Sequence, residues 1–394
     1  MSVHERVRCW RLLVACARHA AGLAGAREVG VAAALIDDWP GAARRASAHG
    51  LLPWLARALA ASGSSDTANA PVSAAASAAA ARTLGQARRL VELCSALDHA
   101  GVPVLPFKGP ALSLQLYGEV ALRESVDLDV MVPLDRYRDA RAALLALGLP
   151  PRGGHSERQE RTLFAWLGHA PFGRGADFVE LHWRFADRRF PFALDLAPAL
   201  ARAHTIRFGG SALPALADDD LLVVLAMHGS RHLYERLEWL AGVTRLLAAH
   251  RGEASRLAAH AESLRARRML LVSVHVARRL LGFPLDDEWR RVLATDPGSE
   301  AAGASMAAEL EAHVLRDVPL SAGVSLQRRY AELVDTRADR ARLYVRAALD
   351  PTARDHEVVA LPDALVPLHH VLRPARLAAT YVARAVAPRV KSER

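Results

Sequence analysis

Lysine is almost absent from this chain. Of its 51 lysine and arginine residues, only Lys108 and Lys391 are lysines, and all the others are arginine. An interior lysine in such a background indicates a position that needs a compact ammonium group and not a planar guanidinium. Lys108 is therefore a candidate functional residue. The alternative is a lysine retained by chance on the surface.

Cysteine and long apolar runs are also scarce. The three cysteines, Cys9, Cys16 and Cys94, have neither disulfide nor metal-ligand spacing, so we expect buried, reduced thiols in a cytoplasmic protein. No apolar run reaches the roughly 18 residues of a transmembrane helix. Aromatic residues make up only 6% of the chain, and the abundant alanine favours helices.

Acidic residues are outnumbered, and the net charge is +9. A basic balance suits a polyanionic partner such as a nucleotide, RNA or an anionic membrane. The alternative is arginine spread over solvated helix faces. The basic segment 365–394 has three interpretations: it lies on a membrane surface, binds RNA or docks on its own domain.

The apolar spacing divides the chain into three regions. Residues 1–95 and 216–394 show helical periodicity, whereas residues 96–215 mix helical and strand patterns. We therefore predict an α+β fold, in which a small mixed-sheet domain is flanked by helical N- and C-terminal regions.

Two carboxylates alternate with apolar residues at the end of the segment 103–133. In a strand, Asp127 and Asp129 share one face, and Val126, Leu128 and Val130 share the other, buried face. Two like charges held so close suit a divalent cation, and oxygen ligands suit Mg²⁺. The alternative is a pair of exposed residues at a sheet edge.

A glycine turn precedes these carboxylates. Gly109 can adopt backbone angles that other residues avoid, and Pro110 suits the first position of a helix. The N-terminus of that helix attracts phosphate through its free N–H groups. Lys108 would add a full positive charge beside it.

A second pair of strands is predicted at 162–167 and 177–185. In the latter, Glu180 and His182 lie on a polar face that could neighbour the Asp127–Asp129 strand, while Asp177 points the other way. A structural, hydrogen-bonded role for His182 is the alternative to contact with substrate or metal.

Two histidines four residues apart, His228 and His232, lie on one face of a helix predicted from Asp218 onward. This is a zinc-pair spacing, but a zinc hydrolase needs glutamate after the first histidine. Gly229 occupies that position, which excludes this mechanism.

The order of these motifs resembles the uncharacterised nucleotidyltransferase family of the DNA polymerase β-type superfamily. The matching segments are FKGPAL, LYG, LRESVDLDVMV, VELHW and HGSRHLYERLEWL, which together span about residues 101–247. Pro110 departs from the superfamily, where a serine or glycine usually follows the glycine, and this removes a hydroxyl contact to the phosphates.

The resemblance implies a cytoplasmic enzyme that transfers a nucleoside monophosphate from an NTP, ATP in the first place, to a hydroxyl or phosphate of a small molecule, protein or RNA. It implies that Asp127, Asp129 and Glu180 are the catalytic residues and bind two Mg²⁺ ions. The implied nucleotide contacts are Lys108, Gly109, Arg123, His228, Arg231 and His232. The alternative is a catalytically silent protein of the same fold that binds nucleotide or RNA.

Overall fold

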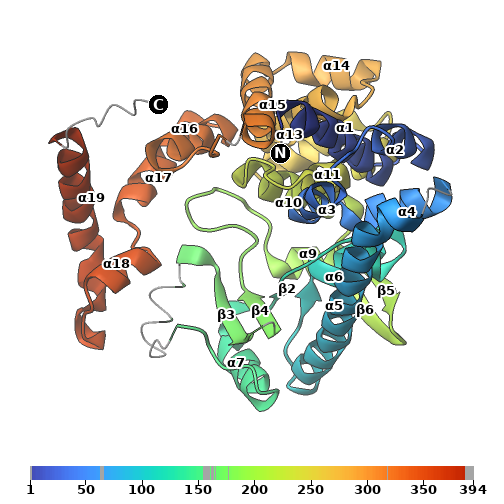
Figure 1. The fold of residues 1–394 in the computed structure, drawn as a ribbon. Helices are drawn as coiled ribbons and strands as arrows, with labels where there is room; N and C mark the ends of the chain where they lie inside the picture. Colours follow the sequence, from blue (N-terminus) through green and yellow to red (C-terminus); the bar gives the residue numbers. More distant parts are fainter. Residues whose placement is uncertain are drawn as a thin grey trace.

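The computed structural model describes residues 2–62, 66–153, 160, 164, 166–175, 177–316 and 318–386. Helices from the first part of the chain gather with α10 to α15 (residues 218–316) at one end of the molecule, and a small mixed sheet with its own helices lies at the other (Figure 1). This is the α+β arrangement, with helical flanks, that the sequence predicts.

The N-terminal helices begin at recognisable caps. Ser2 accepts a hydrogen bond from the backbone N–H of Glu5 at 3.1 Å, and Asp38 accepts one from Gly41 at 2.8 Å, so each satisfies a free helix donor. The last of these helices delivers the chain to the sheet. Their bounds are α1 Val3–Ala20, α2 Ala26–Ala33, α3 Trp39–Ala48, α4 Leu52–Ser62 and α5 Asp66–His99.

Among the described residues the main sheet has four strands in the order β1-β2-β4-β3. β1 is antiparallel to β2, β2 is parallel to β4, and β4 is antiparallel to β3. This confirms the prediction that the strand with Glu180 lies beside the strand with Asp129. The strands are β1 Leu105–Pro106, β2 Leu128–Met131, β3 His169–Arg174 and β4 Asp177–His182.

Apolar side chains of the sheet gather on one face. Leu128 and Val130 of β2, Leu181 of β4 and Phe172 of β3 are buried in a core with apolar residues of α5 and of α7 (Tyr137–Ala146). Because successive side chains of a strand point to opposite faces, the polar residues that alternate with these apolar residues lie on the opposite face of the sheet.

Two details differ from the sequence-based expectations. Val126 is 69% exposed and not buried, because β2 begins only at Leu128 and Asp127 lies in the bend before it. The strand predicted at 162–167 is wrong where the structure describes it, since Phe164 and Trp166 are helical. Gly168, at φ +83°, then turns the chain into β3. Residues 161–163 and 165 lie outside the described part of the chain.

The remainder of the chain adds a short helix and a hairpin that the sequence analysis did not predict, and then the helices that the periodicity predicts. The bounds are α9 Leu196–Arg202, β5 His204–Phe208, β6 Ser211–Ala215, α10 Asp218–Arg231, α11 Leu237–Ala249, α12 Ala254–Ser263, α13 Arg267–Leu281, α14 Asp287–Ala294, α15 Pro297–Arg316, α16 Gly323–Leu333, α17 Arg337–Leu349, α18 Ala353–Val358 and α19 His369–Val386.

The larger hydrophobic core joins helices from opposite ends of the chain. α1 packs against α11, α13 and α15, so that Leu12 and Leu13 share one core with Leu240 and Leu270. The smaller core belongs to the sheet. The division at residues 95 and 215 remains a prediction.

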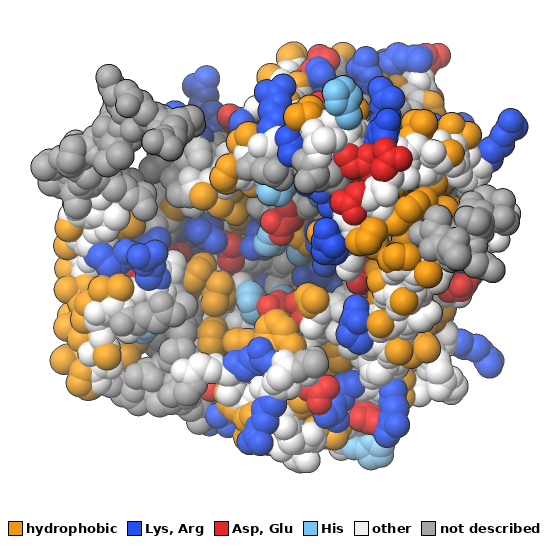
Figure 2. Space-filling view, viewed as in Figure 1, with side chains coloured by type: hydrophobic (Ala, Val, Ile, Leu, Met, Phe, Trp, Pro, Cys, Tyr) orange, Lys and Arg blue, Asp and Glu red, His pale blue; other side chains and the backbone are white. Residues whose placement is uncertain are grey.

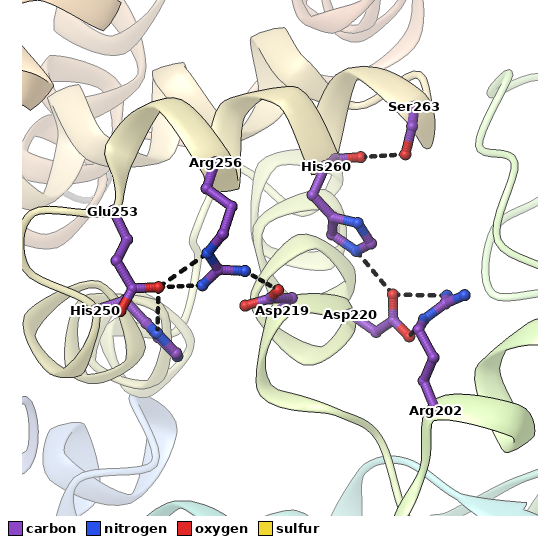
Figure 3. Close-up of polar contacts among 8 residues, drawn as sticks. All are labelled: Arg202, Asp219, Asp220, His250, Glu253, Arg256, His260 and Ser263. Carbon is purple, nitrogen blue, oxygen red and sulfur yellow. Dashed lines mark hydrogen bonds and ion pairs between the residues drawn. The ribbon is translucent and has the colours of Figure 1, made fainter.

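A buried carboxylate fixes the start of α10. Asp220 is fully buried, and it accepts two hydrogen bonds from Arg202 of α9 at 2.9 and 3.0 Å and lies 2.8 Å from Nε2 of His260 on α12 (Figure 3). Beside it, Arg256 pairs with Asp219 (Figure 3). These contacts hold α10, whose other end carries His228 and Arg231, against its neighbours.

The C-terminal helices form an arm at the side of the molecule (Figure 1). α19 packs against α17 and α18, and Arg373 and Arg376 each lie 2.6 Å from a carboxylate oxygen of Asp355. Residues 387–394, including Lys391, lie outside the described part. Among the described helices, none combines the length and the apolar character needed to cross a bilayer.

Candidate active site

The polar face of the sheet carries acidic and imidazole side chains from three adjacent strands. Asp129 of β2 pairs with Glu180 of β4, and His182 of β4 pairs with His169 of β3. Partners on adjacent strands point to the same face. The sheet register therefore brings these four side chains into one group.

Lys108 and Gly109 lie at the start of α6 (Gly109–Tyr117), immediately after β1. Gly109 has φ +61°, a left-handed conformation that side chains disfavour, and a Cβ there would meet the backbone oxygen of Asp127 at 3.4 Å. Pro110 stands in the first turn, and Gly118 ends the helix. The predicted turn and helix are confirmed, so a helix N-terminus lies beside the carboxylates.

Asp129 is the most enclosed of the three predicted metal ligands, with 3% of its surface exposed. Its Oδ1 atom lies 2.9 Å from Nζ of Lys108 and 2.9 Å from Nε2 of His182. The same nitrogen of His182 lies 3.2 Å from Oε2 of Glu180. His182 therefore bridges two carboxylates, which agrees with the hydrogen-bonded role considered for it, while contact with substrate or metal stays a prediction.

The two aspartates differ in their charge environment. Burial and the neighbouring charge of Asp129 raise the pKa of Asp127 to about 6. Burial alone would also raise the pKa of Asp129, but the ammonium of Lys108 and the hydrogen bond from His182 outweigh it and hold that pKa well below its usual range. The site therefore has more carboxylate charge than its own side chains readily neutralise.

A cavity of about 280 Å³ opens over this face of the sheet. Its floor includes Asp127, His169, Glu180, His182 and Lys108, and its opposite wall comes from α10 and α11. Figure 2 shows acidic and histidine side chains in a hollow at the centre of the displayed face. Such a volume is close to the lower end of the range for small-molecule pockets.

The opposite wall is built from packed rings. His228 and His232 have ring centroids 4.7 Å apart, and Trp239 lies 4.7 Å from the first and 5.4 Å from the second. Burial holds the pKa of His228 well below its usual range. Burial and the charge of Arg231 lower the pKa of His232 to about 4. Both rings are thus neutral near pH 7 and offer flat, uncharged surfaces.

Asp187 and Arg231 contribute a buried ion pair at the side of the cavity. Asp187 Oδ2 lies 3.4 Å from Nη2 of Arg231 and 3.0 Å from Nη2 of Arg189. Arg231 also lies 5.3 Å from the ring centre of Phe190. The structure therefore brings the predicted residues His228, Arg231 and His232 to one wall.

Arg123 is placed differently from the other predicted nucleotide contacts. Its guanidinium is buried and forms an ion pair with Glu238 of α11. It does not line the cavity that the described residues form. Burial has the largest effect on the pKa values of Asp127 and His228, but the charge of Arg123 acts to lower both and so contributes to the electrostatics of the site.

His169 and Asp187 were missed by the sequence analysis. The run from Gly173 to Asp177 is a glycine-containing turn between two short alternating segments, which is a hairpin signal. That signal could have placed His169 opposite His182. Asp187 follows β4 in an irregular segment, and no local pattern distinguishes it.

Two overlapping sets of side chains could hold a divalent cation. The first is the predicted carboxylate set, whose donors are all oxygen: Asp127 and Glu180 line the cavity, and Asp129 is buried beside Glu180. The second is His169, Glu180 and His182, whose ligand atoms lie within 4.8 Å of one another. Carboxylate oxygens suit Mg²⁺, and imidazole nitrogens suit transition metals.

Two comparisons with known proteins found a match. The sequence model of a family described as "Uncharacterised nucleotidyltransferase" matches residues 37–282. A solved structure of the antibiotic-resistance factor ANT(2'')-Ia is similar at 14% identity, covering 49% of this chain and 97% of its own, with a TM-score of 0.35. No curated protein matches the chain.

Proposed function

This chain belongs to the uncharacterised nucleotidyltransferase family, and from that premise we propose that it is a Mg²⁺-dependent enzyme that moves a nucleoside monophosphate from an NTP to a hydroxyl or phosphate of an acceptor. ATP is the proposed donor. The acceptor is a small molecule, a protein side chain or an RNA end. The three buried, unpaired cysteines support a cytoplasmic location.

One observation carries the proposal: Asp127 and Glu180 line the same cavity as Lys108 at the start of α6, and Asp129 is buried beside Lys108 and Glu180 on the parallel strand β2. Carboxylates for cations and a phosphate cradle thus lie within one pocket. This is what transfer of a charged phosphoryl group needs, because most of its catalysis is positioning and charge stabilisation.

Asp127, Asp129 and Glu180 would hold two divalent cations, and their oxygen donors fit Mg²⁺. When bound, such ions neutralise the triphosphate and lower the pKa of the attacking hydroxyl. The raised pKa of Asp127 supports this fit, since burial and the charge of Asp129 outweigh the effect of Lys108 and a bound cation would offset both.

The chain's own groups would bind and orient the substrates. The free N–H groups of α6 and the ammonium of Lys108 would bind the β- and γ-phosphates. Glu180 would accept a hydrogen bond from the acceptor hydroxyl and take up its proton. The rings of His228, His232 and Trp239 would pack against the nucleotide's base or sugar, and Arg231 would lie beside them.

Thermal melting with each of the four NTPs, with and without Mg²⁺, tests the proposal without a known acceptor. A ligand at 100 times its dissociation constant stabilises a protein by about 2.7 kcal/mol, which raises the midpoint by a few degrees. We expect a Mg²⁺-dependent rise that the double variant Asp127→Asn/Asp129→Asn loses. Asp98→Asn, an exposed carboxylate on α5, is the matched control and keeps the rise.

A wild-type protein that shows no shift with any NTP would count against an intact nucleotide site. A shift that is independent of both Mg²⁺ and the two aspartates would favour a nucleotide-binding protein without catalysis.

A further inference from the structure

Two imidazoles stand beside the third carboxylate of the site. His169 Nε2 lies 3.8 Å from Oε1 of Glu180, and His182 Nε2 lies 3.2 Å from Oε2 of the same residue. The two rings are 4.8 Å apart between centroids. One carboxylate is therefore flanked on both sides by nitrogen donors.

The spacing of these donors suits a small dication. Metal–ligand bonds of about 2.1 Å in a tetrahedral site place neighbouring ligand atoms about 3.4 Å apart. His182 Nε2 lies 3.2 Å from Oε2 of Glu180, His169 Nε2 lies 3.8 Å from Oε1, and one ligand atom from each of the three residues lies within 4.8 Å of the other two. Closing the group around an ion would therefore need only small side-chain adjustments.

Position in the sheet makes the group rigid. His169 and His182 are register partners on β3 and β4, and Glu180 lies two residues before His182 on the same face. Ligands that project from paired strands are held more firmly than ligands on loops. The side chains are nevertheless reachable, because all three line the cavity and that of His169 is 26% exposed.

A further oxygen lies next to the three donors. Oδ1 of Asp129 is 2.9 Å from the nitrogen of His182 that faces Glu180. Two nitrogens with one or two carboxylate oxygens form a mixed donor set. Imidazole in such a set favours Mn²⁺, Fe²⁺, Co²⁺ or Zn²⁺ over Mg²⁺, which prefers oxygen ligands and keeps its waters.

We propose that His169, Glu180 and His182 form a binding site for a transition-metal dication, next to the oxygen-only position at Asp127 and Asp129. The inference deepens the proposed function: its catalytic meaning rests on nucleotidyl transfer, but its binding chemistry does not. The cation beside Glu180 is then selected by nitrogen donors, and the cation between the two aspartates is the Mg²⁺ that accompanies the nucleotide.

A competing arrangement uses no metal at this position. Doubly protonated His182, held between Asp129 and Glu180, would itself supply a positive charge. The two arrangements differ in whether the full-length protein binds a metal in the absence of nucleotide, and this can be measured directly.

The test is a Co²⁺ titration of chelator-treated, full-length protein without nucleotide, followed by visible absorption, with calorimetric titrations of Zn²⁺, Mn²⁺ and Mg²⁺ alongside. We expect one Co²⁺ per chain with the absorption of mixed nitrogen–oxygen coordination. We expect binding of Zn²⁺ to be at least about tenfold tighter than that of Mg²⁺.

His169→Gln is the decisive variant, because this side chain is partly exposed and its loss leaves the Asp129–His182 contact in place. It is expected to weaken Co²⁺ binding by at least about tenfold. His182→Gln should weaken it similarly, and its melting curve shows whether the variant is folded. His232→Gln, across the same cavity, is the matched histidine control and should keep the Co²⁺ spectrum.

Each outcome bears on one claim. Absence of Co²⁺ and Zn²⁺ binding, or equal binding by wild type and folded His169→Gln, overturns the inference and favours the imidazolium arrangement. Loss of the spectrum in His232→Gln overturns the assigned ligands. Metal binding without any Mg²⁺-dependent NTP shift in melting supports the inference and rejects the proposed function. A Mg²⁺-dependent NTP shift without binding of Co²⁺ or Zn²⁺ rejects only the inference.

Discussion

Asp129 and Glu180 are direct register partners on the parallel strands β2 and β4, although 51 positions separate them in the chain. Side chains at such positions share a face and lie close together. Lys108 contacts Asp129 from one side, and the His182 ring lies between the two carboxylates. The site is thus a coupled group of charges with an excess of carboxylate, and each member has a different consequence when removed.

The two aspartates should respond oppositely to neutralisation. Asp129→Asn leaves the ammonium of Lys108 without its buried partner and should lower stability by about 3 kcal/mol. Asp127→Asn removes a carboxylate whose charge burial disfavours, and its raised pKa predicts an unchanged or higher melting temperature at pH 7 without metal. Melting of both variants in chelator compares them directly. A fall of equal size in both would contradict this charge assignment.

Lys108 should not be replaceable by arginine. Its ammonium contacts Asp129 at 2.9 Å in a position that leaves the side chain 15% exposed, and a wider, planar guanidinium does not fit the same point contact. We expect Lys108→Arg to fold but to bind Mg²⁺–NTP at least about tenfold more weakly, as measured by calorimetry. Arg184→Lys, at another residue lining the same cavity, is the reciprocal control. Wild-type affinity in Lys108→Arg would show that charge alone suffices.

Arg123 and Glu238 should behave as a structural unit. Glu238→Gln leaves a buried guanidinium unpaired and should cost about 3–5 kcal/mol, whereas the double variant Arg123→Met/Glu238→Leu should recover most of that loss. Urea unfolding of the three proteins measures the coupling. If the folded double variant keeps its NTP-dependent melting shift, Arg123 is not a phosphate contact; if it loses the shift, the role first predicted from the sequence stands.

Gly229 is required by the packing of Tyr234. A Cβ at residue 229 would lie 2.2 Å from the Tyr234 ring, which the left-handed conformations of Leu233 (φ 53°) and Tyr234 (φ 51°) bring back against α10. Gly229→Ala should destabilise the protein by about 1–3 kcal/mol and shift the wall that carries His228. Gly85→Ala, in the open interior of α5, should instead be neutral or stabilising by up to about 1 kcal/mol. Equal melting temperatures for the two variants would refute the steric argument.

His49 predicts an acid-sensitive stability. Burial, and then the charges of His313 and Arg236, lower the pKa of His49 in the folded state from 6.5 to about 4. Between these values the unfolded chain binds a proton that the folded chain does not, so stability is complete above pH 6.5 and falls as the pH decreases toward 4. At pH 5 the loss is about 2 kcal/mol. Urea unfolding at pH 7.5 and pH 5 should show a smaller loss for His49→Gln, and an identical loss would exclude this residue.

Much of the site was accessible from local patterns. The alternation around Asp129 and Glu180 indicates two strands, and the Lys108–Gly109–Pro110 sequence indicates a turn into a helix, because each depends only on neighbouring residues. The pairing of the two strands could be predicted only as a hypothesis, because each strand has one polar face that carries carboxylates and one apolar face. Strand β3 was misplaced because the apolar residues Phe164, Trp166 and Leu167 suit a buried helix and a strand equally well.

Long-range relationships were not accessible in this way. Arg123 was predicted to contact phosphate because its ion-pair partner, Glu238, lies on a helix far along the chain and cannot be identified from the residues around Arg123. The bridge that His182 makes between Asp129 and Glu180 depends on strand register, and a shift of one residue would turn these side chains to the other face.

The shared core of α1 and the later helices has a consequence for synthesis on the ribosome. α1 ends at Ala20, and its first late partner, α11, begins at Leu237. At a synthesis rate of about 5–20 residues per second, α11 is translated on the order of 10 s or longer after α1. The sheet and its carboxylates are translated within that interval. During this time α2, α3 and α4 can cover only part of α1, and the apolar surface that later packs against α11, α13 and α15 stays exposed and open to chaperone binding.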